Sequence, residues 1–179
     1  MNPNLLYRTK VYTLGSMEFG DGREWRDRLK LEFAGLSIII LDPYNHQFVH
    51  KIDESEEHRQ NLIKMRQAGK FDELAVFCKE FRTYDLSCVD RSDFVIWYLD
   101  ITIPTIGSVE EFTTAVKMKR PSYVVVKQGK TACPLWLFGM IPHNYIKNSL
   151  EEVIEEIKGI DNGEIEMDDR WRLFNKEIR

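Results

Sequence analysis

The hydrophobic residues of this chain gather in four short runs that are almost wholly apolar. Strands buried on both faces have this composition, whereas a half-exposed strand would alternate between apolar and polar positions. We therefore predict four buried strands, at residues 10–14, 37–41, 94–99 and 123–127.

Between these runs, apolar residues recur at the spacing of amphipathic helices. One stripe begins at Trp25, and the charged stretch 54–81 carries a second pattern that predicts two helices broken near Gly69. Further helices are predicted at 108–118 and 149–158, the last with a capping box formed by Ser149 and a glutamate three residues on. The apolar positions behind these predictions are Trp25, Leu29, Phe33, Leu62, Met65, Leu74, Phe77 and Phe81.

Apolar strands that alternate with helices predict a parallel sheet. We expect an α/β fold of the flavodoxin-like or Rossmann-like type, with about five strands and helices on both faces. Its 179 residues suit one domain, 1–179, with a helical insert at about 54–82. A C-terminal tail at about 160–179 carries Trp171, Leu173 and Phe174 and is expected to dock on the body of the domain. Ligands of such folds bind beyond the carboxyl ends of the strands.

The charge, the segment pattern and the cysteine content argue against several classes of function. The formal net charge is −4, and the acidic and basic residues are interspersed, so we expect no binding to a nucleic-acid polymer. The first residues, MNPNLLYRTK, lack a signal-peptide pattern, and no run approaches a membrane span, so a cytoplasmic protein with no membrane contact is expected. Three cysteines without CxxC spacing argue against a disulfide framework or a zinc ribbon.

Three acidic residues lie where this architecture places chemistry. Asp85 is expected just before the third strand, Asp100 ends that strand, and Glu111 lies in the helix that follows the GSVEE turn. The alternative is that they are helix caps and solvated loop carboxylates, since acidic groups near a helix N-terminus are favoured whatever they do.

Three blocks of the sequence bear on that choice. They are VYTLGSMEF at 11–19 with GREWR at 22–26, DLSCVDRSDFVIWYLD at 85–100, and PTIGSVEEFTTAVKMKRPSYVVV at 104–126. Their order and spacing resemble the nucleoside 2-deoxyribosyltransferases and their nucleotide N-glycosidase relatives. The resemblance covers roughly residues 10–130, apart from the charged helical stretch at 54–81.

The resemblance implies a role for several residues. Glu111 aligns with the nucleophilic glutamate, which the Gly-x-x-x-Glu spacing favours over Glu110, and Asp85 aligns with the aspartate that manages the proton of the departing base. Tyr12 lies in the segment that supplies a tyrosine near the nucleophile. Substrate contacts are expected from residues of the loop after the first strand and around the third strand's end, namely Gly15, Ser16, Met17, Phe19, Asp100, Thr105, Gly107 and Ser108.

These residue types suit the cleavage of a glycosidic bond between a sugar and a base. A carboxylate can stabilise an oxocarbenium-like transition state and trap it as a covalent ester, while a second acid protonates the leaving base. A second base or water can then resolve the ester, so transfer and hydrolysis are both open. Thr105 stands where the family often carries an aspartate, which also keeps a non-catalytic nucleotide-binding module in consideration.

The remaining expectations concern ligands. The resemblance implies that the partners are a nucleoside or nucleotide and a free nucleobase, with no cofactor. It also implies a homo-oligomer in which a neighbouring chain helps to close the pocket. His46 and His50 are four apart but fall in a loop, so no metal site is expected, and His143 is expected at the surface or an interface.

A 5′-phosphate could bind Ser108 at a helix N-terminus, or Arg23 or Arg26, although solvated arginines are more common. For stacking on a base, Phe19 is a better candidate than the aromatic set Trp97, Tyr98, Phe112 and Trp136.

Overall fold

The centre of the molecule is a five-stranded, all-parallel sheet. The structure, a computed structural model, describes residues 4–17, 22–44 and 55–171. The strand order is β2-β1-β3-β4-β5, which is the flavodoxin-like order. The strands are β1 (Lys10–Gly15), β2 (Ile39–Leu41), β3 (Phe94–Leu99), β4 (Ser122–Val126) and β5 (Ile146–Lys147). The predicted fold class is confirmed.

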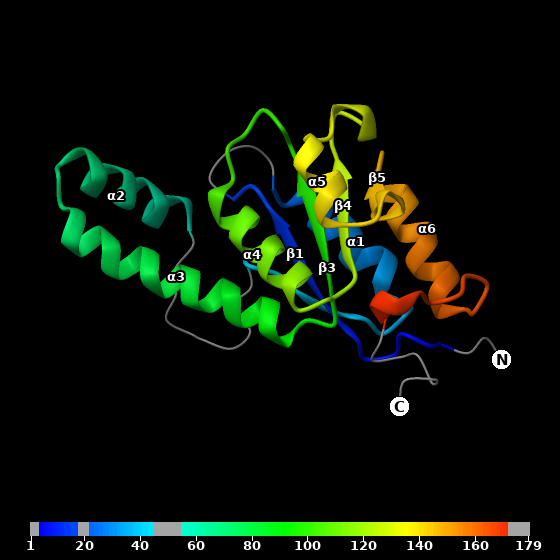
Figure 1. The fold of residues 1–179 in the computed structure, drawn as a ribbon. Coiled ribbons are helices and arrows are strands. Elements are labelled where there is room, and N and C mark those ends of the chain that lie inside the picture. Colours follow the sequence, from blue (N-terminus) through cyan, green and yellow to red (C-terminus); the bar gives the residue numbers. More distant parts are fainter. Residues whose placement is uncertain (1–3, 18–21, 45–54, 172–179) are drawn as a thin grey trace.

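Helices cover both faces of this sheet (Figure 1). On one face lie α4 (Ile106–Lys117) and the C-terminal part of α3 (Phe71–Arg91), which contact each other and β1. On the other lie α1 (Glu24–Ala34) and α6 (Leu150–Asp161), which also contact each other. The remaining helices are α2 (Glu56–Gln67), α5 (Leu135–Met140) and the short 3-10 turns η1 (Lys130–Ala132), η2 (His143–Tyr145) and η3 (Asp169–Trp171).

Burial explains why the strands lack alternation. Trp97 packs against Phe112 of α4 with ring centroids 5.0 Å apart, whereas its neighbour Tyr98 stacks on Trp25 of α1 at 5.2 Å. Successive strand residues point to opposite faces, and here both faces are covered. Trp97 and Tyr98 therefore both pack against helices, the first buried and the second half-buried.

The predicted break near Gly69 is confirmed, but the helix after it is longer than expected. Gly69 has a positive φ of 72°, which glycine adopts without strain, and it separates α2 from α3. α3 then continues through Asp85 to Arg91, because no glycine or proline interrupts residues 71–91. The expectation that Asp85 lies just before a strand is therefore wrong, since it lies on α3 nine residues before the first residue of β3.

The end of the described chain packs on the amino-terminal side of the sheet. Trp171 is 2% exposed, and its ring lies 5.2 Å from that of Phe94, the first residue of β3. Ser149 caps α6 by accepting a hydrogen bond from the Glu152 amide, as the capping box predicts, while the Glu152 carboxylate accepts from the amide of Asn148. Leu173 and Phe174 lie outside the described residues.

Candidate active site

A cavity of about 420 Å³ opens at the carboxyl ends of β1 and β3. These neighbouring strands are where the strand order reverses, which is the switch point at which parallel sheets of this kind form clefts. The lining combines the segment after β1, the loop before α4, the start of α4 and one side of α3. Predicted residues in the lining are Tyr12, Gly15, Ser16, Met17, Asp85, Thr105, Gly107, Ser108 and Glu111.

Two carboxylates reach this cavity from different helices. Glu111 lies in the second turn of α4, is 8% exposed, and has one carboxylate oxygen 3.9 Å from where a Cβ on Gly107 would stand. Asp85 comes from α3 and is half-buried. α3 and α4 pack side by side, so acids 26 positions apart in the sequence line one hollow.

The neighbouring Glu110 has quite different surroundings. Its carboxylate accepts two hydrogen bonds from the Arg82 guanidinium on α3, one of them 2.8 Å long, and its side chain is 42% exposed. Glu110 is not among the residues that line the cavity. Successive helix residues point about 100° apart, which is why only one of the two glutamates faces the hollow.

Tyr12 lies on β1 beneath the cavity and is 1% exposed. Burial raises the pKa of its phenol well above the ordinary value, and the negative charges of Glu111 and Asp85 raise that pKa further. The phenol is therefore a neutral hydrogen-bond donor at physiological pH. The same two carboxylates contribute, after burial, to raising the pKa of the nearby Cys88 thiol to about 12.

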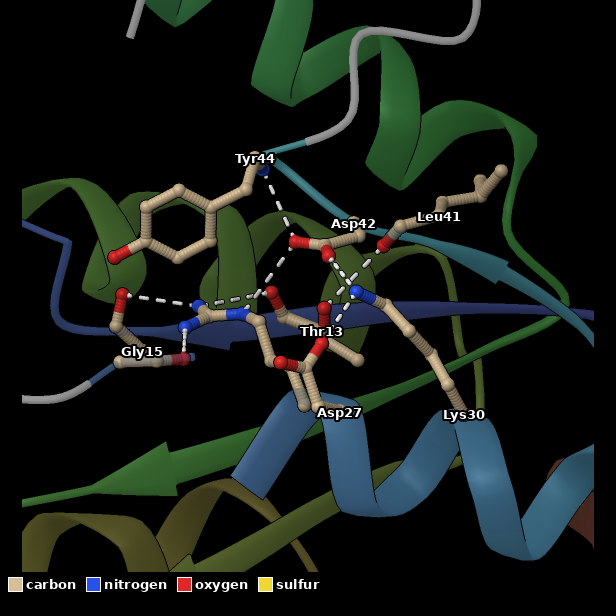
Figure 2. Close-up of polar contacts among 9 residues, drawn as sticks. Thr13, Gly15, Asp27, Lys30, Leu41, Asp42 and Tyr44 are labelled. Carbon is tan, nitrogen blue, oxygen red and sulfur yellow. Dashed lines mark hydrogen bonds and ion pairs between the residues drawn. The ribbon is translucent and has the colours of Figure 1, made fainter. Parts of the chain in front are cut away.

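Arg26 is buried rather than solvated and lines the cavity, so the contact with a 5′-phosphate considered for it stays a prediction. Its guanidinium donates to the carbonyls of Thr13, Gly15 and Gly22 and lies 3.9 Å from an Asp42 carboxylate oxygen. Figure 2 shows this region, with Lys30 reaching Asp42 and the Tyr44 amide donating to the same carboxylate. Burial lowers the pKa of Arg26, while Asp42 is the first of the groups that oppose this shift.

This arginine holds together the start of the loop after β1. Its bonds to the carbonyls of residues 13, 15 and 22 join the two ends of that loop, whose residues 18–21, including Phe19, lie outside the described chain. Gly15 is required there by close approach, because an added Cβ would lie 3.0 Å from the Tyr98 carbonyl oxygen and 3.2 Å from the Trp25 ring. Arg23 is exposed and stacks on the Tyr44 ring at 4.6 Å.

The amino-terminal end of α4 forms another wall of the cavity. Thr105 is the N-cap residue and makes no side-chain cap bond, and Gly107 and the buried Ser108 follow in the first turn. The first amides of a helix have no partner within the helix and favour an anion. This wall can therefore receive a polar or negatively charged part of a ligand.

Asp100 is not in the lining of this cavity, although it shares a neighbouring hollow with Thr105, which lines both. Its carboxylate accepts from Lys127 at 2.7 Å, from Gln128 at 2.6 Å and from Thr102, and the Lys127 bond is the largest cause of its strongly lowered pKa. It lines a separate hollow with Trp97 and Trp136 rather than the cavity that holds Glu111. Asp100 therefore fastens the chain after β3 to the chain after β4. The aromatic set Trp97, Tyr98, Phe112 and Trp136 is likewise absent from the cavity lining.

Sequence reasoning missed part of this lining. Arg66 of α2 reaches the cavity with an exposed side chain, and Thr13, Pro43, Pro104 and Ile106 also line it. The apolar pattern of α2 gives no sign of this, because the pattern does not show how the α2–α3 hairpin lies against the sheet. Pro43 follows β2, so its place at the carboxyl edge could have been anticipated from the parallel order.

The described part of the chain contains neither a cluster of metal ligands nor a helix that could span a membrane. Within residues 4–17, 22–44 and 55–171, no group of three or more histidine, cysteine, aspartate or glutamate side chains is arranged to hold a metal ion. His46 and His50 lie outside those ranges, and His143 is exposed. No helix in the same ranges has the length and apolar character needed to cross a membrane.

Comparisons with known proteins give a resemblance in fold alone. No protein-family model matches the sequence, and no curated protein matches it. Among solved structures, the chain is similar to the CMP N-glycosidase BcmB of Clostridium botulinum, with a TM-score of 0.47 and 12% sequence identity. The alignment covers 84% of this chain and 98% of that one. A likeness of this degree carries no functional argument, so function is argued from the residues of the cavity.

Proposed function

We propose that this protein cleaves the N-glycosidic bond of a deoxynucleoside or its 5′-monophosphate and transfers the sugar to a second nucleobase. The observation that carries the proposal is that Glu111, Asp85 and Tyr12 line one cavity at the switch point of the sheet. The resemblance of the sequence blocks around these residues to the nucleoside 2-deoxyribosyltransferases supports the same reaction.

The reaction divides into two displacements at the anomeric carbon. The Glu111 carboxylate attacks that carbon as its bond to the base breaks, and the electron pair of the broken bond goes to the base nitrogen. Asp85, in its protonated form, gives that nitrogen its proton, which makes the base a better leaving group. The product of this step is a glycosyl ester on Glu111 and a neutral free base.

The second displacement reverses these roles. A ring nitrogen of another base attacks the anomeric carbon, the ester bond breaks, and Asp85 takes up the proton released by the incoming base. In this proposal, the neutral phenol of Tyr12 is the group that would donate a hydrogen bond to the Glu111 carboxylate and orient it. Water in place of the second base would give hydrolysis from the same intermediate.

The remaining lining residues would hold the sugar and its 5′ group. Ser16 and the backbone at Gly15 approach from β1, and Met17 follows them. Thr105, Gly107 and Ser108 bring the amino-terminal end of α4, which suits a 5′-hydroxyl or a 5′-phosphate. Phe19 and Asp100 stay proposals for substrate contact, the first outside the described residues and the second outside this cavity.

One incubation separates the proposed activity from its alternatives. The protein is mixed with a 2′-deoxynucleoside or its 5′-monophosphate and a second free base, and all species are followed by chromatography. A new nucleoside demonstrates transfer, whereas free base without a new nucleoside demonstrates hydrolysis. Binding without any turnover would contradict the enzyme and favour the non-catalytic module that Thr105 keeps in consideration.

Two neighbouring variants test the nucleophile. Glu111→Gln is expected to lower turnover by about 10³-fold or more, because the amide cannot form the ester. Glu110→Gln is the matched control and should retain activity, since Glu110 faces Arg82 rather than the cavity. Normal turnover by Glu111→Gln would remove Glu111 from the mechanism.

A further inference from the structure

A second hollow lies between the two helices of the insert. α2 and the first part of α3 form a hairpin that extends away from the sheet (Figure 1). The hollow between them has a volume of about 310 Å³, at the lower end of the range for small-molecule pockets. Its wall is mainly apolar and consists of Leu62, Ile63, Leu74, Phe81, Met17 and Cys78, with Arg59, Arg66 and Asp85 at its polar positions.

Contacts between the two helices, and from α2 to the loop after β1, hold the helices in place around this hollow. His58 of α2 packs edge-on against Phe77 and Phe81 of α3, with ring centroids 5.5 and 5.9 Å apart. The Arg59 guanidinium donates to the carbonyl oxygen of Met17 and lies 5.5 Å from the Tyr44 ring. The hairpin is thereby tied to the loop after β1, which forms part of the candidate active site.

The hollow adjoins the candidate active site. Met17, Arg66 and Asp85 line both, so the boundary between the two runs past the Asp85 carboxylate. On one side of this boundary the lining carries hydroxyl and carboxyl groups, and on the other side it is aliphatic and aromatic. A ligand that spans it would place a polar part beside Glu111 and an apolar part between the helices.

The position of Asp85 identifies which part of a substrate enters the hollow. In the proposed reaction this carboxyl group protonates the leaving base, so the base lies at the boundary and the sugar lies toward Glu111. Whatever extends from the base away from the sugar points toward the hairpin. The hollow itself offers such a group apolar walls, and burial of apolar surface is the interaction those walls provide.

We propose that the α2–α3 hollow binds an apolar substituent on the departing base, so that the preferred substrate is a nucleoside or nucleotide whose base carries an aromatic or aliphatic extension. The inference rests on the proposed function, because that reaction puts the base beside Asp85. The hairpin would then be a specificity element, since its walls come from the stretch 54–81 that the sequence resemblance does not cover.

The first test compares nucleosides that differ only in an apolar extension. The pairs are 2′-deoxyadenosine with N6-benzoyl-2′-deoxyadenosine, and 2′-deoxycytidine with N4-benzoyl-2′-deoxycytidine, each also as the 5′-monophosphate. Dissociation constants are measured on Glu111→Gln protein so that no substrate is consumed. At least one benzoyl derivative is expected to bind about tenfold more tightly than its parent, as burial of a ring predicts.

Two matched substitutions locate the effect. Leu74→Trp places a larger side chain in the hollow and should reduce the ratio of parent to derivative dissociation constants to near one. Leu31→Trp makes the same change on the far helix α1, where Leu31 is 79% exposed, and should leave that ratio at its original value. A ratio that is unaffected by Leu74→Trp, or equally affected by both substitutions, overturns the inference.

Cys78 supplies a measurement that needs no substitution. It is exposed and lines the hollow, whereas the other two cysteines, Cys88 and Cys133, are buried. A benzoyl derivative at saturation should slow the modification of Cys78 by N-ethylmaleimide, and its saturated parent should slow it less. Equal protection by both contradicts the hollow as the binding site of the extension.

The two proposals fail in different ways. If parent nucleosides are bound and turned over while every derivative binds no better, the reaction stands and the hollow is excluded as a substituent site. If neither parents nor derivatives bind, the proposed function and this inference are both wrong.

Discussion

Among single residues, Glu110 and Glu111 are adjacent and of the same type, but their surroundings differ. One is paired with Arg82 on the outside of the α3–α4 contact, and the other is buried against the cavity. The Gly-x-x-x-Glu spacing already favoured Glu111, and the direction of the two side chains agrees with that choice. The role of Glu111 as nucleophile stays a proposal until its chemistry is measured.

The loss of kcat on replacing Asp85 should depend on how strongly the leaving base needs a proton. We expect Asp85→Asn to lower kcat by about 10²–10⁴-fold for an ordinary nucleobase, which is the usual contribution of general acid catalysis. The loss should be smaller for a substrate whose leaving group departs without protonation. Glu80→Gln, on an exposed position of the same helix, is the control and should change neither rate. Equal losses for both kinds of leaving group would contradict the role in proton transfer.

Tyr12 should keep its proton at high pH. Its pKa is raised, first by burial and then by Glu111 and Asp85, whereas an exposed tyrosine is about half ionised near pH 10. Ultraviolet difference spectra of the wild type and Tyr12→Phe should therefore show the same tyrosinate signal at pH 10. A larger signal in the wild type would contradict the raised pKa.

The raised pKa of Tyr12 also determines how its ionisation changes the free energy of unfolding with pH. The native state holds the Tyr12 proton to higher pH than the unfolded state, so the contribution is intact below about pH 10 and is lost as the pH rises further. The free energy of unfolding of the wild type should consequently fall more steeply above pH 10 than that of Tyr12→Phe.

At the scale of elements, Arg26 of α1 fixes the carboxyl end of β1. Arg26→Met would remove bonds to three backbone carbonyls and leave Asp42, which is 3% exposed, with Lys30 as its remaining cation. We expect the free energy of unfolding to fall by about 3 kcal/mol, as for other broken buried ion pairs.

The control for this prediction lies two residues further along the same helix, and its side chain is exposed. Arg28 is also on α1 and pairs with Glu151 across exposed side chains, so Arg28→Met should cost at most about 1 kcal/mol. Both values come from urea unfolding. Similar values for the two variants would mean that the buried guanidinium does not hold the loop.

Elements marked by a long apolar run or a clear apolar stripe were predictable from the sequence, and short or interrupted ones were not. Phe94–Leu99 matches the predicted strand in both bounds, because six apolar residues between polar ones admit little else. β5 has two residues and α5 has six, so neither carries a recognisable period. The extension of α3 to Arg91 was missed because residues 82–91 are mostly polar and were assigned to the approach of the next strand.

At the scale of the whole molecule, topology brings the candidate site together. Parallel strands place their carboxyl ends at one edge, which is why residues after β1 and after β3 could be expected to meet. The contribution of Arg66 could not be expected, because it depends on how the α2–α3 hairpin folds back toward the sheet. The expected homo-oligomer likewise depends on surfaces that a single chain does not pair, and it stays a prediction.

The docked Trp171 stabilises the end of the sheet that lies away from the cavity. Trp171→Ala should lower the free energy of unfolding by about 3–5 kcal/mol, because a buried aromatic side chain is lost from beside Phe94. KM of the folded variant should be unchanged. Trp136→Ala, at a position that is 81% exposed, is the control and should change stability by about 0.5 kcal/mol or less. A large rise in KM for Trp171→Ala would show that the two ends are coupled.

The proposed covalent bond between Glu111 and the sugar can be tested by trapping it. A 2′-fluoro-2′-deoxynucleoside, whose fluorine slows both displacements, is incubated with the wild type, Glu111→Gln and Glu110→Gln, followed by intact-mass analysis and peptide mapping. We predict a fluorosugar adduct on the peptide that contains Glu111, in the wild type and Glu110→Gln but not in Glu111→Gln. Turnover of the natural substrate without any adduct, or an adduct mapped to another residue, would exclude Glu111 as the nucleophile.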